Sequence, residues 1–335
     1  MGICIKNSGA VPAALLALAL VLGGAVPSRA ALIREYRFFT AELHTKEKRL
    51  ALIALRRFRM NGSEHYLAVD PETLRTEIVP VGKYLILKKR LNDILGRRKG
   101  FAYSRAIRFA GQNSWRLQNA GITHIPGSDR DVYCTVDLCP TGLPLDRAMF
   151  NRLVRDYGPY HRPVPVALAV SGLWIEKHPG DLLWLCGLAR RNDLAVTWVN
   201  HTYHHRYKKR APLWKNFLLD VGSKLDEEVM RNEITMLESG LVPSVFFRFP
   251  GLVSNKALFN GVAGYGLIPL GSDAWLGKKQ WPAGGSIILV HANGQEPVGI
   301  KRFLWILDSK RKEIAAGQWV FGDLHDGLRR AMKMY

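Results

Sequence analysis

The stretch PVALAVSGLWIEKHPGDLLWLCGLARRNDLAVTWVNHTYHH, residues 165–205, decides the fold. It runs from one apolar segment of strand length through a helical pattern into a second apolar segment, which predicts parallel strands joined by a helix. The stretch ends in His201 and His205, and on a helical turn this spacing points both imidazoles the same way, toward one divalent metal. The spacing also arises by chance among ten histidines, which would then be solvated or core residues.

Residues 129–335 repeat this alternation of short apolar strands and longer amphipathic helices. The other predicted strands are VYCTVD, VPVALAV, SVFFRF, LIPLGSD and SIILVH, and the other predicted helices are LDRAMFNRLVRDY, LDEEVMRNEITMLES and KRFLWILDSKRKEIAA. Repeated strand–helix units predict an α/β fold with a parallel sheet wrapped by helices. Its functional site is expected at the carboxyl ends of the strands.

Residues 31–128 show a different pattern, in which short strands follow one another without long helices between them. REYRFFTAEL, KRLALIALRRFRM and HYLAVD read as strands, with turn signals at Asn61-Gly62 and Asp70-Pro71. The basic segment 95–115 is less regular and is predicted to be a join. We therefore expect a β-rich basic accessory domain at 31–128, ahead of the α/β domain at 129–335.

The first thirty residues predict export. The apolar run at 11–26 follows Lys6, and Ser28 and Ala30 suit the positions before a cleavage site, which is the pattern of a signal peptide. An uncleaved membrane anchor is the alternative. We expect a periplasmic or extracellular protein, or one anchored to the outer face of the inner membrane.

The chain is strongly basic, with a formal net charge of +20 that becomes +18 once Lys6 and Arg29 leave with the signal peptide. Such a charge favours contact with an anionic surface, for which the basic N-terminal domain is the candidate, although arginines on solvated faces would give the same composition. No nucleic-acid-binding signature is evident, so no nucleic acid partner is expected. Cys134, Cys139 and Cys186 remain after cleavage. A Cys134–Cys139 bridge is conceivable, whereas Cys186 in LLWLCGLA suits a buried apolar position.

Four further segments flank the histidine pair in a fixed order: TVDLCP (135–140), FRFPG (247–251), SDAW (272–275) and IILVHANG (287–294). The ordered set resembles the polysaccharide deacetylase family, the NodB-like carbohydrate esterases of family 4. Their motifs read roughly TFDDGP, HTxxH, RPPYG, DxxDW and LxH. The resemblance covers about residues 130–325, and it implies a distorted (β/α) barrel with fewer than eight repeats.

The resemblance also assigns roles to residues that each follow a predicted strand. It implies that His201 and His205 hold a divalent metal, with Zn²⁺ the expected ion. Asp137 would act as general base and His291 would protonate the leaving amine. Arg248 would orient Asp137 by charge-assisted hydrogen bonds, and Asp273 would orient His291.

The substrate side of the site follows from the same resemblance. The backbone N–H of Gly251, where the family often has tyrosine, would contribute to an oxyanion hole. Leu289, two residues before His291 on the same side of its strand, would line the pocket for the acetyl methyl group, and Trp275 would contact the substrate.

The main departure from the family is Leu138, which stands where the second aspartate completes the metal ligands; Cys139 also replaces the motif glycine. Three interpretations follow: two histidines completed by water or another side chain, a site that uses the Cys139 thiolate, or a degenerate site that binds sugar without hydrolysis. We expect an exported metal-dependent hydrolase that removes acetyl groups from an N- or O-acetylated polysaccharide or peptidoglycan. A non-catalytic carbohydrate-binding or cell-wall scaffold protein is the alternative.

Overall fold

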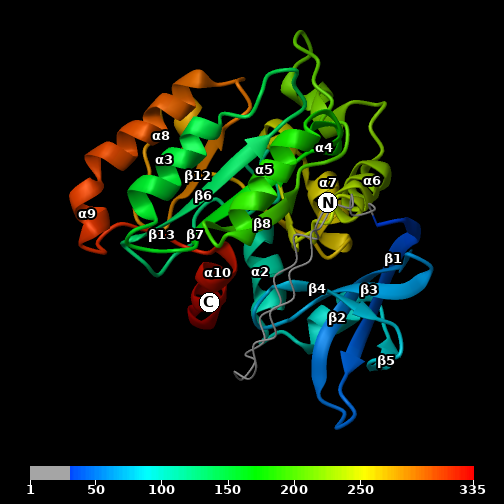
Figure 1. Cartoon of the computed structure of the whole chain (residues 1–335). Helices are drawn as coiled ribbons and strands as arrows, with labels where there is room; N and C mark the ends of the chain where they lie inside the picture. The colour runs from blue at the N-terminus through cyan, green and yellow to red at the C-terminus, as the bar shows by residue number, and fades with distance from the viewer. Residues whose placement is uncertain (1–30) are drawn as a thin grey trace, which may run out of the picture.

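Two β-sheets organise the protein, and the computed structural model describes them within residues 31–335 (Figure 1). The expected signal peptide at 1–30 lies outside the described residues. None of the helices within 31–335 is both long and apolar enough to cross a bilayer.

The N-terminal sheet is antiparallel, with strand order β4-β3-β2-β1-β5. Its strands are β1 (Ile33–His44), β2 (Leu50–Met60), β3 (Ser63–Val69), β4 (Thr76–Pro80) and β5 (Leu85–Lys88). Asn61 and Gly62 connect β2 to β3 with positive φ angles of 51° and 87°, as the two-residue hairpin turn predicted by this dipeptide requires. The β-rich character predicted for the start of the chain is therefore confirmed.

The segment predicted to be an irregular join is helical, so that prediction is wrong. It forms α1 (Leu91–Arg97) and α2 (Ala102–Gly111). The apolar residues of α2 recur at helical spacing, and Tyr103, Ala106 and Ala110 are fully buried in the core beneath the parallel sheet. Helix α2 packs beside the C-terminal helix α10 (Leu324–Met334), as Figure 1 shows.

The second sheet is parallel, with order β10-β9-β8-β7-β6-β12-β11 and β13 paired to β6. Its strands are β6 (Asp131–Leu138), β7 (Val164–Val170), β8 (Leu194–Asn200), β9 (Phe246–Phe247), β10 (Ile268–Pro269), β11 (Ala274–Trp275), β12 (Ile287–His291) and β13 (Val320–Phe321). β6 and β7 are buried along their whole length, as expected for strands covered on both faces. The predicted α/β fold with a curled parallel sheet and an additional N-terminal β-sheet is confirmed.

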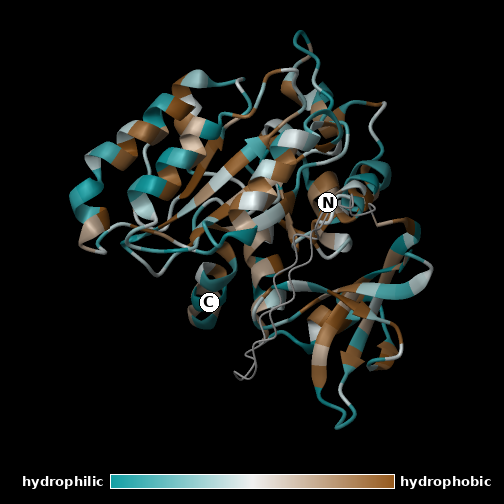
Figure 2. Cartoon of the chain, viewed as in Figure 1, coloured by the Kyte–Doolittle hydropathy of each residue, from teal (hydrophilic) through white to brown (hydrophobic). Residues whose placement is uncertain are grey.

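Amphipathic helices cover the parallel sheet, and hydrophilic and hydrophobic residues alternate along them in Figure 2. They are α3 (Arg147–Tyr157), α4 (Gly172–Lys177), α5 (Pro179–Arg190), α6 (Leu225–Glu238), α7 (Lys256–Gly264), α8 (Pro297–Ser309) and α9 (Arg311–Ala315). Short 3₁₀ turns are η1 (Leu213–Lys215), η2 (Phe217–Leu219), η3 (Pro250–Leu252) and η4 (Leu276–Lys278). The segment predicted as one helix at 301–316 is divided at Lys310 between α8 and α9.

The chain segment at 118–125 fills the open side of the curled sheet. Gln118 bridges to Val253, and Ile122 bridges to Leu270 just after β10. On the other side, His124 bridges to Ser286 just before β12. This segment thus connects the chain beside β10 with the chain beside β12, and the open side of the sheet is covered by chain that precedes its first strand.

Candidate active site

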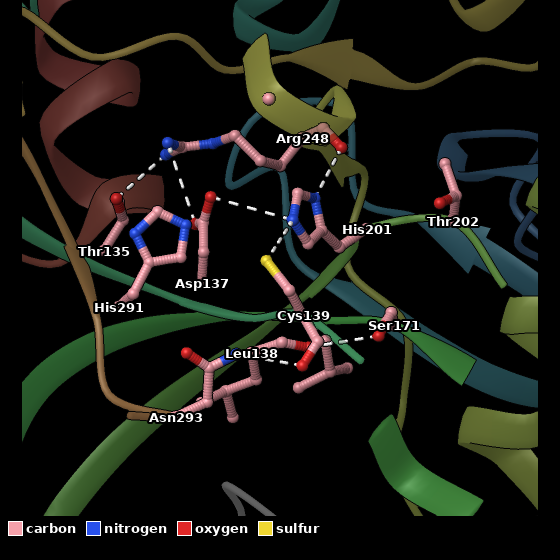
Figure 3. Close-up of polar contacts among 12 residues, drawn as sticks. Thr135, Asp137, Leu138, Cys139, Ser171, His201, Thr202, Arg248, His291 and Asn293 are labelled. Carbon is pink, nitrogen blue, oxygen red and sulfur yellow. Dashed lines mark hydrogen bonds and ion pairs between the residues drawn. The ribbon is translucent and has the colours of Figure 1, made fainter. Parts of the chain in front are cut away.

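The carboxyl ends of four parallel strands bring the candidate residues together (Figure 3). Asp137 lies near the end of β6, and His291 at the end of β12 is its register partner on the neighbouring strand. His201 directly follows β8, and Arg248 directly follows β9. All four side chains are largely or fully buried. These four side chains therefore lie together at the strand ends, whereas Asp273 contacts His124 instead.

The two histidines converge without a helix, so the helical turn predicted from their spacing is wrong. Residues 201–205 form an irregular loop in which Thr202 and His205 have positive φ angles of 66° and 49°. The loop nevertheless places the two imidazole rings edge to face, with centroids 4.6 Å apart. A turn of left-handed backbone thus produces the shared direction that a helix would have given.

His201 is held as a neutral imidazole with one nitrogen available to a ligand. Its Nδ1 lies 2.9 Å from the carbonyl oxygen of Arg248, to which it must donate. Nε2 then carries the lone pair, and it lies 3.6 Å from Sγ of Cys139 and 3.7 Å from Oδ2 of Asp137. Burial lowers the pKa of His201, which favours the neutral form that binds metals.

Cys139 supplies the third donor atom of a compact set. The ligating atoms of Cys139, His201 and His205 all lie within 4.8 Å of one another, and Nε2 of His205 is buried without a hydrogen-bond partner among the described residues. Burial raises the pKa of the Cys139 thiol, but the nearby His205 and His291 more than offset this and lower it to about 7. One thiolate and two imidazoles form a donor set typical of Zn²⁺. These residues therefore fit the metal that the sequence resemblance implies.

The other cysteines take no part in this set. Within residues 31–335 all three cysteines are buried and none forms a disulfide, so the Cys134–Cys139 bridge is not formed. Burial raises the pKa of Cys134 to about 12, which keeps that thiol protonated. Cys186 is 5 % exposed in α5, in agreement with the buried apolar position expected for it.

Leu138 faces away from the donor set (Figure 3). Its side chain is fully buried in the apolar cluster between the parallel sheet and its helices, together with Met149 and Trp174. Neighbouring residues of a strand point to opposite faces, so Leu138 shares its face with Val136 and not with Asp137. Its carbonyl oxygen accepts a hydrogen bond from Oγ of Ser171 at 3.1 Å. The leucine is therefore a core residue of this fold.

Asp137 and Arg248 form a buried ion pair instead of the expected hydrogen bonds. Nη1 of Arg248 lies 3.8 Å from Oδ1 of Asp137, while Nη2 donates to Oγ1 of Thr135 at 2.9 Å. Oδ1 has no hydrogen-bond partner within residues 31–335. Burial raises the pKa of Asp137, but Arg248 and the surrounding imidazoles outweigh burial and hold it below its usual value. The carboxylate is therefore ionised and free to accept a proton.

His291 is oriented by Glu296 and not by Asp273. Nδ1 of His291 lies 2.9 Å from Oε2 of Glu296. Asp273 instead contacts Nδ1 of His124 at 2.8 Å and accepts from Oγ of Ser286 at 3.1 Å, so it fastens the segment that closes the barrel. Burial lowers the pKa of His291, but Cys139, Glu296 and Asp137 together raise it well above its ordinary value. The expected Asp273–His291 contact is thus wrong, and a carboxylate from the next loop takes its place.

A phenylalanine explains the glycine at 251. Gly251 has a φ of 60°, and a Cβ there would overlap with Cζ of Phe217. The Phe217 ring therefore fills the space in which the family's tyrosine would begin, and its centroid is 5.8 Å from that of His205.

The other two residues expected to contact the substrate lie near His291. Leu289 is buried in β12, two residues before His291 and on the same face of the strand. Trp275 lies with its ring centroid 5.9 Å from that of His291.

Three residues of the site were missed in the sequence. Thr135 holds Arg248, Glu296 holds His291, and the buried Asn293 donates through Nδ2 to the carbonyl oxygen of Cys139 at 2.9 Å. The sequence could have placed Thr135 in the site, because Thr135 lies two residues before Asp137 on the same face of a strand. Asn293 and Glu296 lie in the loop after β12, where the sequence has no periodic pattern that would identify them as site residues.

The chain is similar to a few known proteins. A family model described as the RP012 protein N-terminal domain matches residues 34–95. Among solved structures, a family 4 carbohydrate esterase from Bacillus anthracis has 18 % identity and a TM-score of 0.45, covering 67 % of this chain and 91 % of its own.

Two other solved structures show the same level of similarity. A peptidoglycan deacetylase from Bacillus subtilis has 15 % identity and a TM-score of 0.41, covering 62 % of this chain and 93 % of its own. A family 4 pseudoenzyme from Bacillus anthracis has 14 % identity and a TM-score of 0.43, covering 63 % and 70 %. These similar structures therefore come from the same family, the polysaccharide deacetylases of carbohydrate esterase family 4, that the sequence motifs resemble.

Proposed function

We propose that this protein is an exported, metal-dependent hydrolase that removes acetyl groups from an N-acetylated polysaccharide or peptidoglycan. One observation carries the proposal: a metal donor set, an ionised carboxylate and a raised-pKa imidazole lie together at the carboxyl ends of β6, β8 and β12. The donor set is Cys139, His201 and His205, the carboxylate is Asp137, and the imidazole is His291. A protein that only binds glycan does not need an ionised carboxylate and a raised-pKa imidazole next to a metal donor set.

Each side chain then has one task in the hydrolysis of an acetamide. A divalent ion held by Cys139, His201 and His205 would act as a Lewis acid toward the acetyl carbonyl and the attacking water. Asp137 takes a proton from that water as its oxygen bonds to the carbonyl carbon. When the C–N bond breaks, its electron pair goes to the nitrogen, and His291 supplies the proton. The products are acetate and a free amino group on the sugar.

The oxyanion of the tetrahedral intermediate requires a hydrogen-bond donor, which we place in η3. The backbone N–H of Gly251 is our candidate, since η3 begins two residues after Arg248 and the Phe217 ring borders it. Leu289 would line the space for the acetyl methyl group. An O-acetyl ester would fit the same arrangement, with an alcohol as the leaving group.

The location and the polymer contact follow from the charge and the first thirty residues. The signal-peptide pattern at 1–30 supports export, and the net charge of +20 supports attraction to anionic cell-wall polymer. On the N-terminal sheet, exposed basic residues lie in the hairpin between β1 and β2, in the turn between β4 and β5, and in β5 itself: Lys46, Lys48, Lys83 and Lys88. Retention on anionic glycan should therefore weaken as salt rises, since exposed charges are screened over about 10 Å at 0.1 M.

The proposal is tested by acetate release from N-acetylglucosamine oligomers, acetylated xylan and peptidoglycan. We expect release by the parent protein and a loss of at least about 100-fold in turnover for Asp137→Asn and for His291→Ala, the usual scale for removal of a general base or acid. Circular dichroism should show both variants folded. A variant that deacetylates like the parent would contradict the role given to that residue.

The competing function is a non-catalytic glycan-binding scaffold, which Leu138 favours because no carboxylate completes the donor set. A protein that binds glycan, takes up no metal and releases no acetate from any of these substrates would establish the scaffold.

A further inference from the structure

Two half-exposed tryptophans lie together on the surface, one after η4 and one in α8. Trp281 is 52 % exposed and Trp305, on the outer side of α8, is 56 % exposed. Their ring centroids are 5.1 Å apart, and the rings are tilted by 58°. Single exposed apolar side chains are ordinary, but a pair of exposed indoles in contact is not.

The pair is flanked by cationic donors. The guanidinium carbon of Arg302 lies 6.0 Å from the centroid of the Trp281 ring, and its Nη1 donates to the carbonyl oxygen of Leu276 at 2.7 Å. This bond fixes α8 against η4, so the relative position of the two tryptophans is set by the fold. A guanidinium has five N–H groups, so Arg302 has further donors for a ligand beyond the one bonded to Leu276.

A short hydrogen-bonded turn connects the pair to the active site. Gln280, the residue before Trp281, accepts from the backbone N–H of Trp275 at 2.8 Å, and its own N–H donates to the carbonyl of Trp275 at 3.2 Å. Trp275 in turn donates through Nε1 to Glu296, the partner of His291. Hydrogen bonds therefore connect the residue next to Trp281 with the partner of the proposed proton donor through Trp275.

We propose that Trp281, Trp305 and Arg302, here called the Trp281–Trp305 surface, bind sugar residues that neighbour the acetylated one in the same polysaccharide chain. A pyranose ring presents a face of C–H groups and a rim of hydroxyls, which suits an aromatic face beside N–H donors. This inference rests on the proposed function, because it takes the acetylated sugar to lie next to His291. Its consequence is a protein that prefers long glycan chains to single sugars.

The test measures binding to the full chain, stripped of metal so that no turnover occurs, by titration calorimetry with the N-acetylglucosamine pentamer. We expect Trp281→Ala and Trp305→Ala each to weaken pentamer binding by about 10-fold, the usual scale for loss of an aromatic anchor. Trp281→Phe should keep most of the affinity. Trp115→Ala removes a comparably exposed indole, 69 % exposed beside Arg116, and should bind the pentamer like the parent.

Activity measurements separate this inference from the proposed function. In metal-loaded protein, Trp281→Ala should raise KM for the pentamer and leave kcat unchanged, because the tryptophans touch no reacting atom. A parent that deacetylates the pentamer, with tryptophan variants that bind it equally well, would overturn the surface alone. A parent that neither binds nor deacetylates the pentamer would overturn the proposed function, and this inference with it.

Discussion

Oε2 of Glu296 lies 2.9 Å from Nδ1 of His291 and also accepts from Nε1 of Trp275 at 2.9 Å. One carboxylate thus fixes the orientation of the imidazole and favours its protonated form. The hydrogen bonds also hold Glu296 ionised: burial raises its pKa, but His291 and Trp275 lower it below the usual value.

We expect Glu296→Gln to lower kcat by about 10- to 100-fold, because an amide keeps the bond to Trp275 but no longer stabilises the imidazolium of His291. Without the carboxylate the pKa of His291 falls. The alkaline decline of the rate should therefore move to lower pH, which a merely structural role would not cause. Asp273→Asn is the control: it should leave this decline in place, since Asp273 contacts His124. A shift with Asp273→Asn alone would restore the pairing expected from the sequence.

Metal binding should depend on Cys139 and not on Cys134. Cys139→Ser exchanges a thiolate for a hydroxyl and should leave the protein with substoichiometric Zn²⁺ after dialysis against a chelator, as should His205→Ala. Cys134→Ser alters a buried thiol on the opposite face of the same strand and should leave the zinc content unchanged. Elemental analysis of the folded proteins decides the point. Equal zinc in the two cysteine variants would exclude Cys139 as a ligand.

Leu138→Asp should destabilise the protein without improving the metal site. The carboxylate would enter an apolar cluster with no charged partner, which costs several kcal/mol. Denaturant unfolding should show this loss, and zinc affinity should not rise. Leu138→Met, which keeps the volume and the apolar character, should cost less than about 1.5 kcal/mol. If Leu138→Asp bound zinc more tightly at unchanged stability, the leucine would face the metal after all.

The sequence predicted the elements whose signal is local and missed those that depend on contacts across the fold. The apolar run LAVTWV predicted β8, and the order of motifs predicted which strand ends meet. The partner of His291 could not be predicted, because Asp273 and Glu296 both lie within reach in sequence and only the packing of the segment with His124 decides between them. The loop that orients His205 depends on left-handed backbone, which spacing does not reveal.

Acid should remove a contribution of Asp323 to stability. Burial raises the pKa of Asp323, but His325, Arg75 and the N–H of Asp326 outweigh burial and hold it well below its usual range. Because the folded pKa is depressed, the stabilisation is complete above the unfolded value of about 4 and is lost progressively as pH falls from there through the lower folded value. Asp323→Asn retains the helix cap of α10 but loses the charge. It should cost about 1–2 kcal/mol at pH 7 and much less at about pH 2, measured by urea unfolding. An equal cost at both pH values would contradict this account.

The N-terminal sheet should be docked firmly on the parallel sheet through Arg56. Nε and Nη2 of Arg56 donate to both carboxylate oxygens of Glu233 in α6, at 2.7 and 3.0 Å, and both side chains are 1 % exposed. Glu233→Gln leaves a buried guanidinium without its counter-charge, which costs about 3–5 kcal/mol. The partly exposed pair Arg57–Glu64 is the matched control, and Glu64→Gln should cost at most about 1 kcal/mol.

The double variant Arg56→Met with Glu233→Leu tests whether the charge itself is needed. It removes both buried charges together, so it should recover most of the stability lost in Glu233→Gln, although Tyr36 then loses its acceptor on Glu233. Tyr36→Phe in the same background should recover more. Urea unfolding monitored by tryptophan fluorescence and by far-ultraviolet circular dichroism gives these values. Unfolding of Glu233→Gln in two separate steps would mean that the ion pair couples the two sheets, whereas a single step at unchanged stability would mean that apolar contacts alone hold them together.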